Sequence, residues 1–547
     1  MERTKNEVLR TTTMDYLKDL DTSNGIDEEL IESELLQSIR NEFEIENSRK
    51  LDKKRHWAIP QELSFMQIAD IMAYLYPICK ISCAGENADS DFDLVAIYKE
   101  DGPNEGIYVT DNEEFRVIAN KFNYDLTSKA FEEIMIAIRT KIPQKTRCTD
   151  PDLIAVNNGI FNYKTKELQP FTPDIVFMTK SHVDYNPNAT TMIIHNDEDN
   201  TDWDVESWMN DLSDDPEIVN SLWEILGAII RPNVRWNKSA WFYSEQGNNG
   251  KGTLCELMRQ LCGTGAYASI SISDFNKDFM LEPLTRASAI IVDENDVGSF
   301  IDKAANLKAV ITNDVILINR KFKIPIAYQF YGFMVQCLNE FPRIKDKSDS
   351  FYRRQLFIPF EKCFTGKERK YIKYDYLHRT EVLEYVMYKV LNMNYYTLSE
   401  PDACKNVLAQ YKEYNDPIRQ FVEEMLPLCV WDLLPFGFLY ELYKSWFRKN
   451  SPSGSPQGKK TFIKDIINVT KDSDEWYCQG QDAKIKVANR MDEPELLIVQ
   501  YDLNDWKNLK YHGNDINKIC KPVLAQAYRG LRRYDAANPS NDGDDDN

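Results

Sequence analysis

The segment Trp241–Leu254, WFYSEQGNNGKGTL, is the stretch that decides the expected fold. It opens with an apolar run that is typical of a buried parallel strand. A loop with two glycines and two asparagines follows, and the chain continues through Gly-Lys-Gly-Thr into leucine and methionine residues at helical spacing. A strand, a glycine-rich loop and a helix in this order are the context that a phosphate-binding loop requires. The sequence therefore predicts an α/β nucleotide-binding core.

The residues of this loop predict how ATP is held. Gly247 and Gly250 allow successive backbone amides to point at one anion, and the following helix adds partial positive charge at its N-terminus. Lys251 is predicted to reach the outer phosphates, and Thr253 to offer its hydroxyl to Mg²⁺. The predicted ATP-binding residues are Gly247, Asn248, Asn249, Gly250, Lys251, Gly252 and Thr253.

The loop departs from the usual motif at two positions. Glu245 stands where the first glycine is expected, and Gly252 separates Lys251 from Thr253. The alternative interpretation is a glycine-rich turn with a chance Gly-Lys pair. The apolar strand before the loop and the periodic helix after it favour the phosphate-binding loop.

A second apolar strand, within ASAIIVDEN at Ala287–Asn295, ends in two carboxylates. Ligands bind at the carboxyl edge of parallel α/β sheets, which is where Asp293 and Glu294 are then expected to lie. Asp293 is predicted to hold Mg²⁺, and Glu294 to deprotonate the water that attacks the γ-phosphate. A strand end that is acidic by chance is the less favoured alternative, because the strand follows the loop at the expected distance.

Polar residues follow two later strands. An apolar run over Phe333–Leu338 ends at Asn339, whose amide is predicted to position the attacking water or to sense the γ-phosphate. Arg353 and Arg354 enter the strand after that, where an arginine can reach the nucleotide of a neighbouring subunit and neutralise charge in the transition state. Surface salt bridging is the alternative for this pair. The predicted catalytic residues are Lys251, Asp293, Glu294, Asn339, Arg353 and Arg354.

Composition limits the classes of function. A chain of 547 residues predicts several domains. The net charge of −21 excludes a surface coated with basic residues, although it allows a local basic channel. The charged N-terminus and the lack of a long apolar run predict a cytoplasmic protein with no membrane partner. Eleven cysteines without paired metal spacing predict no zinc site.

The region before the core is predicted from composition and turn signals. Residues 1–58 are acidic and helical in pattern, and we expect this segment to be loosely tethered. The segment DSDFD at Asp89–Asp93 has the alternating aspartates that some polymerases use for metal, but a polar loop is the favoured interpretation. Turn signals at Asn157–Gly159 and Lys164–Lys166 separate short apolar runs and predict a β-hairpin.

The C-terminal region is predicted to contain a winged-helix module. Helices over Phe438–Phe447 and Thr461–Val469 precede strand-like segments at Lys484–Val487 and Leu496–Val499. Lysines on the second helix are either phosphate contacts or part of a solvated helix face; they are Lys459, Lys460 and Lys464. The final SNDGDDDN is predicted to be a solvated, disordered end.

The motif order resembles the superfamily 3 helicase domain of phage and plasmid primase-helicases, the group that includes the poxvirus primase-helicase. The matching elements are GNNGKGT, IIVDEN, the strand ending at Asn339, and YRRQLFIPF. The resemblance implies an AAA+ fold, a ring that is usually hexameric, ATP sites between subunits, and a DNA-binding hairpin. Asp314–Ala327 stands where that hairpin belongs, so Arg320, Lys321 and Lys323 are the predicted DNA-binding residues. Thr312 and Asn313 replace the paired glycines common in this group.

The predicted fold class is α/β, with an AAA+ P-loop ATPase core, a small α+β N-terminal region and a C-terminal helical and winged-helix module. The predicted domains are an acidic helical segment (1–58), a small mixed α+β domain (59–149), a helicase-preceding domain (150–216), the AAA+ superfamily 3 helicase domain (217–375), a helical region (376–450) and a winged-helix-like module with an acidic tail (451–547).

The predicted function is that of an ATP- and Mg²⁺-dependent DNA helicase for the replication of a phage, plasmid or mobile element, acting in the cytoplasm of a bacterial host. The expected partners are single-stranded and fork DNA, further copies of the chain in a hexameric ring, and a primase or origin-binding protein. Two alternatives stay open at this point. One is a DNA-binding initiator or assembly scaffold that uses ATP only as a ligand, and the other is a P-loop nucleotide kinase.

Overall fold

The computed structural model describes residues 3–21, 25–82, 93–296, 298, 300–321, 323–366, 368–450, 455–471 and 473–534. The chain divides into two compact units, Met1–Leu408 and Ala409–Asn547. Most of the DSDFD segment and all of the acidic tail lie outside the described residues, so the predictions for them stay predictions. Within the described ranges, no helix is both long enough and apolar enough to cross a membrane.

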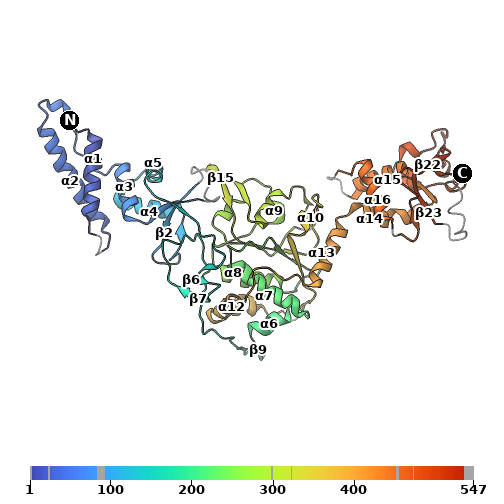
Figure 1. The fold of residues 1–547 in the computed structure, drawn as a ribbon, viewed down its shortest axis with the longest axis horizontal. Coiled ribbons are helices and arrows are strands. Elements are labelled where there is room, and N and C mark those ends of the chain that lie inside the picture. Colours follow the sequence, from blue (N-terminus) through green and yellow to red (C-terminus); the bar gives the residue numbers. More distant parts are fainter. Residues whose placement is uncertain are drawn as a thin grey trace. The chain divides into compact units, whose positions relative to one another are not determined.

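A five-stranded parallel sheet forms the centre of the first unit (Figure 1). Its strands, in spatial order, are β11 (Tyr267–Ala268), β12 (Ala289–Val292), β16 (Phe333–Leu338), β10 (Ser239–Tyr243) and β18 (Gln355–Pro359). All four neighbouring pairs are parallel. Their residues are almost all buried, because elements of the chain pack against both faces of the sheet. The predicted α/β class with a parallel sheet is confirmed.

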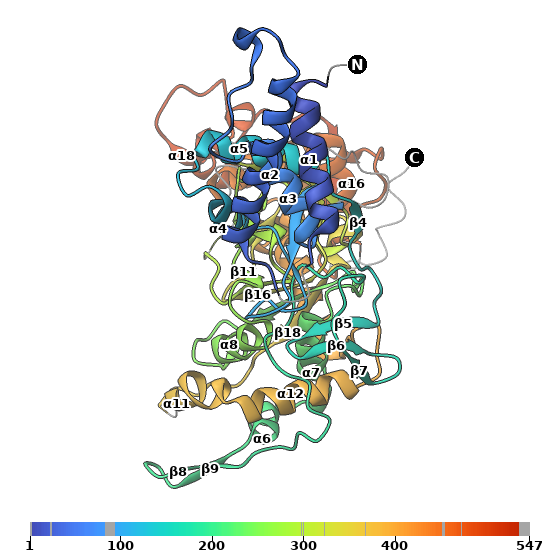
Figure 2. The same cartoon turned by 90° about the vertical axis from the view of Figure 1, so that its left-hand side faces the viewer.

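Three helices pack together on one side of this sheet (Figures 1 and 2). They are α7 (Pro216–Ile230), α8 (Lys251–Cys262) and α12 (Thr380–Asn392). The Asp215 carboxylate caps α7 by accepting a hydrogen bond from the amide of Glu217, and Pro216 occupies the first turn. Apolar residues of the three helices and the sheet form one continuous core.

A β-hairpin leads into strand β16. It consists of β14 (Val315–Arg320) and β15 (Lys323–Gln329), which pair antiparallel, and it follows helix α9 (Ala305–Ile311). The hairpin predicted over Asp314–Ala327 is confirmed as a structural element. Asn313, just before it, has φ of 53°, a left-handed conformation that glycine prefers and asparagine tolerates. This explains how asparagine can stand at a position where the helicase domains that the motif order resembles commonly have glycine.

The base of the hairpin is fixed to the start of β16 by a buried amide. The Asn313 side chain donates hydrogen bonds to the carbonyls of Phe330 (2.9 Å) and Gly332 (3.3 Å), and the Gln329 amide donates to the Asn313 carbonyl (2.9 Å). A Cβ added at Gly332 would lie 2.3 Å from the carbonyl oxygen of Ser288, so a side chain does not fit there. The segment between β15 and β16 is thus held at several points.

Among its described residues, the N-terminal region contains five α-helices and a four-stranded sheet. The helices are α1 (Lys5–Asp19), α2 (Glu28–Ser48), α3 (Phe65–Leu75), α4 (Asn112–Phe122) and α5 (Ser128–Arg139). The sheet has the order β3 (Tyr108–Val109), β2 (Leu94–Tyr98), β1 (Ile78–Ser82) and β4 (Gln144–Thr146). This agrees with the mixed α+β character predicted after residue 58.

The expectation that the first helices are loosely tethered is wrong. Val8 of α1 and Phe43 of α2 are fully buried in the same apolar core as Phe115 of α4. The Gln67 amide donates to the hydroxyl of Thr13 at 3.1 Å inside this core. The apolar residues of α1 and α2 recur on one helix face, and that face is covered here although the rest of each helix is acidic.

The segment after Asp150 forms the predicted β-hairpin and two further elements. Strands β5 (Leu153–Val156), β6 (Gly159–Asn162) and β7 (Glu167–Gln169) pair antiparallel, followed by the pair β8 (Ile194–Asn196) and β9 (Thr201–Trp203), and by helix α6 (Val205–Asp211). Arg231, at the end of α7, is fully buried among the rings of Tyr163, Trp236 and Tyr395. This contact joins the hairpin to the core of the first unit.

The second unit has its own apolar core of helices and short strands. Its main helices are α14 (Pro417–Met425), α15 (Phe436–Asn450) and α16 (Lys459–Val469), and a small sheet has the order β19 (Leu433–Pro435), β23 (Gly530–Arg533), β20 (Trp476–Tyr477). A further pair joins β21 (Ile485–Lys486) to β22 (Ala527–Tyr528). The two predicted helices and the strand near Lys484–Val487 are confirmed.

The predicted strand at Leu496–Val499 is wrong, because Leu497–Gln500 forms helix α17. The buried Glu495 carboxylate accepts hydrogen bonds from the amides of Val430 and Trp431, and it also faces the amide of Leu497 at 3.4 Å. The backbone carbonyls of Glu495 and Leu496 accept hydrogen bonds from the amides of Ile498 and Val499, which closes a helical turn. A short apolar run alone does not distinguish such a turn from a strand.

Candidate active site

The loop between β10 and α8 contains two residues in the left-handed conformation and leads directly into the helix. Asn248 and Gly250 both have positive φ, 55° and 87°, and Gly250 is the N-cap of α8. A Cβ at Gly250 would lie 2.6 Å from the Leu212 side chain, so this position needs glycine for space as well as for conformation. The first amides of α8 consequently face the loop, as anion binding at a helix N-terminus requires.

Two asparagines hold this loop in place. The Asn249 amide donates to the carbonyl of Gln246 at 2.6 Å, and the Asn248 carbonyl accepts the amide hydrogen of Phe364 at 2.7 Å. Glu245 is exposed and has an ordinary negative φ, and its carboxylate accepts a bond from the hydroxyl of Tyr243 at 3.1 Å. The backbone at position 245 therefore does not require the glycine found in the usual motif.

Lys251 is buried and its ammonium group contacts neutral acceptors. It donates to the Leu338 carbonyl at 3.0 Å, to Asn339 Oδ1 at 2.8 Å and to the Ser244 carbonyl at 3.4 Å. Burial lowers the pKa of Lys251. Within the described part of the chain, no carboxylate pairs with this buried ammonium group, so its attraction for a phosphate is not yet satisfied. The contact also brings two of the predicted catalytic residues, Lys251 and Asn339, together.

The two predicted acidic residues have different surroundings. The Asp293 side chain is 37% exposed, and its Oδ1 forms an ion pair with Arg259 Nη2 of α8 at 3.0 Å. Glu294 is exposed, and within the described part of the chain nothing bonds to its carboxylate. An unrestrained carboxylate that faces solvent is suited to bind a water molecule and accept its proton. Arg259 was not identified from the sequence, because one arginine on a helix gives no signal.

Strand β16 lies between β10, whose loop leads to Lys251, and β12, which ends just before Asp293. Cys337 of this strand interacts electrostatically with both groups, although burial is the main reason that its pKa is raised. Lys251, Asp293 and Asn339 therefore lie at one edge of the sheet, where the carboxyl ends of β10, β12 and β16 meet.

Asn295 is a second residue that sequence reasoning did not single out. Its amide donates to Gln336 Oε1 at 2.9 Å and to the Cys337 carbonyl at 3.1 Å, and its Oδ1 accepts the Ile272 amide hydrogen at 3.0 Å. These bonds fix the chain directly after Glu294. The position of Asn295 two residues beyond Asp293 is the only sequence signal that could have pointed to it.

The two arginines near β18 differ in their contacts. Arg354 donates to the Ser350 hydroxyl at 2.8 Å and also to the Ser350 carbonyl, and burial lowers its pKa. Arg353 is exposed, and no partner for it is found among the described residues. Arg353 is thus available to a neighbouring molecule, whereas Arg354 is held within its own chain.

The basic residues predicted to bind DNA lie around the turn of the β14–β15 hairpin. Arg320 pairs with Lys323 in the hairpin register, and Lys321 at the turn is exposed. The structure thus brings the three residues together at the end of one hairpin. Among the described residues, no cluster of three or more His, Cys, Asp or Glu is arranged to hold a metal ion.

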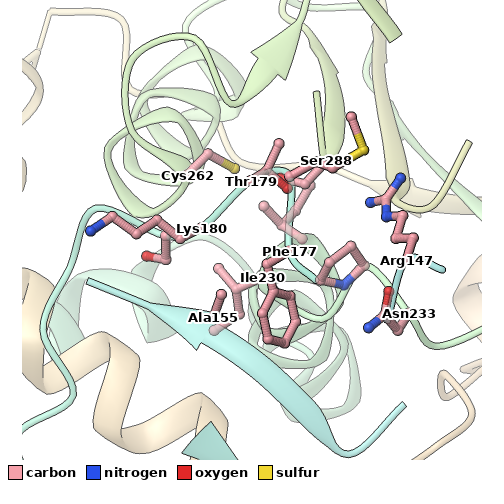
Figure 3. A pocket seen from close by; sticks show the side chains of 13 residues that line it. Arg147, Ala155, Phe177, Thr179, Lys180, Ile230, Asn233, Cys262 and Ser288 are labelled. Atoms are coloured by element: carbon pink, nitrogen blue, oxygen red, sulfur yellow. The ribbon is translucent and has the colours of Figure 1, made fainter. Parts of the chain in front are cut away.

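A small cavity lies away from this sheet edge, between the segment after Asp150 and the core (Figure 3). Its lining includes Ala155, Lys180, Cys262 and Ser288, and its volume is about 20 Å³. This space suits a single water molecule and is far too small for a nucleotide. The candidate site is therefore the open sheet edge and not this cavity.

Comparisons with known proteins agree with the motif order. Three family models match successive segments: D5 N terminal like (36–214), a family of unknown function, DUF5906 (242–354), and Poxvirus D5 protein-like (413–508). The resemblance to the poxvirus primase-helicase group is thereby confirmed. No curated protein matches the chain.

Solved structures were also compared with the chain. The apo structure of the NrS-1 C-terminal region is 13% identical, covers 86% of this chain and 99% of its own, and has a TM-score of 0.39. A second, A-form apo structure of the same region is 12% identical, covers 82% and 93%, and has a TM-score of 0.39.

Proposed function

We propose that this protein is an ATP-dependent DNA helicase with an AAA+ core, acting as a ring of identical subunits. The observation that carries the proposal is the meeting of Lys251, Asn339 and Asp293 at one sheet edge, next to a loop shaped for phosphate. The D5-related segments on both sides of this core support a role in replication.

ATP hydrolysis at this edge needs binding, charge neutralisation and activation of water. The α8 amides and Lys251 would hold the phosphates, and Thr253 with Asp293 supplies oxygen ligands for Mg²⁺. Bound Mg²⁺ would neutralise charge on the phosphate oxygens. Glu294 would accept the proton of the attacking water, with Asn295 keeping the strand end in position. Asn339 would exchange its contact with Lys251 for one with water or the γ-phosphate.

We expect Arg353, rather than Arg354, to act on the nucleotide of an adjacent subunit. Arg353→Ala should lower ATP turnover about 10³-fold, as the loss of an arginine finger does, with nucleotide binding retained. Arg354→Ala should instead mainly lower the melting temperature, since it removes the contacts with Ser350. Turnover and thermal unfolding measure the two effects.

A mixing experiment tests whether the arginine acts between subunits. Lys251→Ala and Arg353→Ala proteins, each inactive alone, should regain part of the turnover when mixed, because some interfaces then combine an intact Lys251 with an intact Arg353. Failure of every mixture to recover activity, with assembly demonstrated, would contradict a site shared between subunits.

The β14–β15 hairpin is proposed to contact single-stranded DNA through Arg320, Lys321 and Lys323. The direct test of the function is ATP turnover measured with and without single-stranded DNA. Turnover should rise with DNA in the unchanged protein. In Lys321→Ala, turnover with DNA should fall to the level without DNA, and DNA affinity should fall several-fold with a reduced salt dependence.

Lys129→Ala provides the matched control, since Lys129 is an exposed lysine on α5, far from the hairpin in sequence. It should keep the DNA response. Equal loss in both variants would assign the effect to general charge, and a lack of DNA stimulation in the unchanged protein would reject a DNA motor.

The second unit is proposed to be a winged-helix module that binds fork DNA or helps to load the ring. Its support is the arrangement of three helices with the β19-β23-β20 sheet and the β21–β22 pair. Lys460 and Lys464 are exposed on α16, opposite the buried Phe462 and Ile466. A primase or origin-binding partner is proposed on the family resemblance alone.

A replication scaffold that uses ATP only as a ligand is the second candidate. The exposed Glu245 carboxylate on the loop favours it, because a negative charge near the phosphates opposes ATP binding. Such a scaffold would bind ATP without DNA-stimulated turnover. A nucleotide kinase has less support, since Glu294 and Arg353 suit transfer to water at a shared interface.

A further inference from the structure

Arg259 on α8 links two carboxylates beside the candidate catalytic site. One guanidinium nitrogen, Nη2, lies 3.0 Å from Asp293 Oδ1, and the other, Nη1, lies 3.5 Å from Glu256 Oε2. The Arg259 side chain is only 16% exposed. The guanidinium group is therefore a positive charge next to the carboxylate that is proposed to bind Mg²⁺.

A positive charge at this place opposes the binding of a divalent cation. Arg259 neutralises Asp293 and at the same time repels any cation that approaches the same carboxylate. Mg²⁺ therefore has to compete with Arg259 for Asp293. The competition depends on one arginine of α8, about two helical turns beyond the loop.

When Mg²⁺ occupies Asp293, Glu256 remains as a second partner for Arg259. Glu256 is itself held in place, because Gln260 donates to its carboxylate at 2.8 Å and His378 lies 3.5 Å from it. A largely buried guanidinium that loses one carboxylate but keeps the other is not left uncompensated. Arg259 can therefore release Asp293 without leaving its own charge unpaired in the protein interior.

We propose that Arg259 is a positioning residue that holds Asp293 in the nucleotide-free protein and yields it to Mg²⁺ by turning to Glu256. It thus sets the Mg²⁺ concentration at which nucleotide binds tightly. This inference rests on the proposed function, because it takes Asp293 as the Mg²⁺ ligand. It assigns Arg259 and Glu256 a regulatory role that the motif does not contain.

The test measures nucleotide binding without hydrolysis. The dissociation constant of a fluorescent, non-hydrolysable ATP analogue is determined in excess Mg²⁺ and in EDTA. The affinity in Mg²⁺ divided by the affinity in EDTA, each the reciprocal of its dissociation constant, is the Mg²⁺-to-EDTA ratio and reports how strongly Mg²⁺ supports binding. In Arg259→Gln, this ratio should increase roughly tenfold, the size expected when a unit charge beside a divalent ion is removed. The half-saturating Mg²⁺ concentration should fall in parallel.

Two further variants separate this role from a structural one. Glu256→Gln removes the second partner, so Arg259 should stay on Asp293 and the ratio should decrease. Arg259→Lys keeps the positive charge and should give a ratio close to that of the unchanged protein. If Arg259 had only a structural role, the substitutions Arg259→Gln and Glu256→Gln would not change this ratio in opposite directions.

Two results would overturn the inference. One is an unchanged Mg²⁺-to-EDTA ratio in Arg259→Gln, and the other is an equal weakening of binding in both conditions, which would place Arg259 on the phosphates. Neither result bears on the proposed function, which fails separately if the unchanged protein shows no DNA-stimulated turnover.

Discussion

Lys251→Ala should abolish ATP turnover, with a loss of at least about 100-fold in rate and a clear loss of nucleotide affinity. The reason lies in the surroundings of the ammonium group, which is buried and bonded to the neutral oxygens of Ser244, Leu338 and Asn339. A charge kept in such a place interacts strongly with phosphate, since little solvent screens it. Steady-state turnover and binding of a fluorescent ATP analogue measure both losses.

Lys251→Met separates the loss of charge from the loss of packing. Methionine fills most of the lysine volume, so it should lose turnover to the same extent as alanine but should destabilise the fold less. The melting temperature of each variant tests this difference. Turnover within a fewfold of the unchanged protein in both variants would reject Lys251 as the phosphate ligand.

Glu294→Gln should eliminate hydrolysis and leave ATP binding intact. Glutamine keeps the size of the side chain and removes the group that accepts the proton of water, so a fall of about 10²–10⁴-fold in turnover is expected. Because the Glu294 carboxylate is exposed and has no partner within the described chain, the substitution should leave stability unchanged. Turnover, nucleotide affinity and melting temperature are the three measurements.

Glu340→Gln is the matched control for this substitution. Glu340 is also exposed and directly follows Asn339, so it carries the same charge close to the same sheet edge. A small effect there would show that the position of Glu294, and not its charge alone, is decisive. If turnover is unchanged in Glu294→Gln, Glu294 is not the general base. Asp293 would then be tested as the base in its place.

The parallel sheet could be predicted because its strands are short apolar runs that end in polar residues. Lys251, Asp293 and Asn339 each follow such a run, and parallel topology brings the ends of these runs together. The β14–β15 hairpin was predicted from the family resemblance, and Asn313 shows why the replacement of glycine there did not disturb it.

Other features could not be predicted because they depend on contacts between distant segments. The contact of Arg259 with Asp293 joins residues 34 positions apart, and nothing local in the sequence marks it. The burial of α1 against α2 and α3 depends on which apolar faces meet in space. The turn at Leu497 depends on the Glu495 carboxylate, which also binds the distant amide of Val430.

The short connection between β15 and β16 has a thermodynamic consequence. Three residues separate the end of the hairpin from the strand that leads to Asn339, and Asn313 binds two carbonyls within that connection. Because this connection is short and hydrogen-bonded, the hairpin and β16 have little freedom to move independently. A displacement of the hairpin would therefore also displace β16 and Asn339, which contacts Lys251. The coupling would act in both directions. If bound nucleotide and bound DNA favour the same position of the hairpin, each must raise the binding affinity of the other by the same factor.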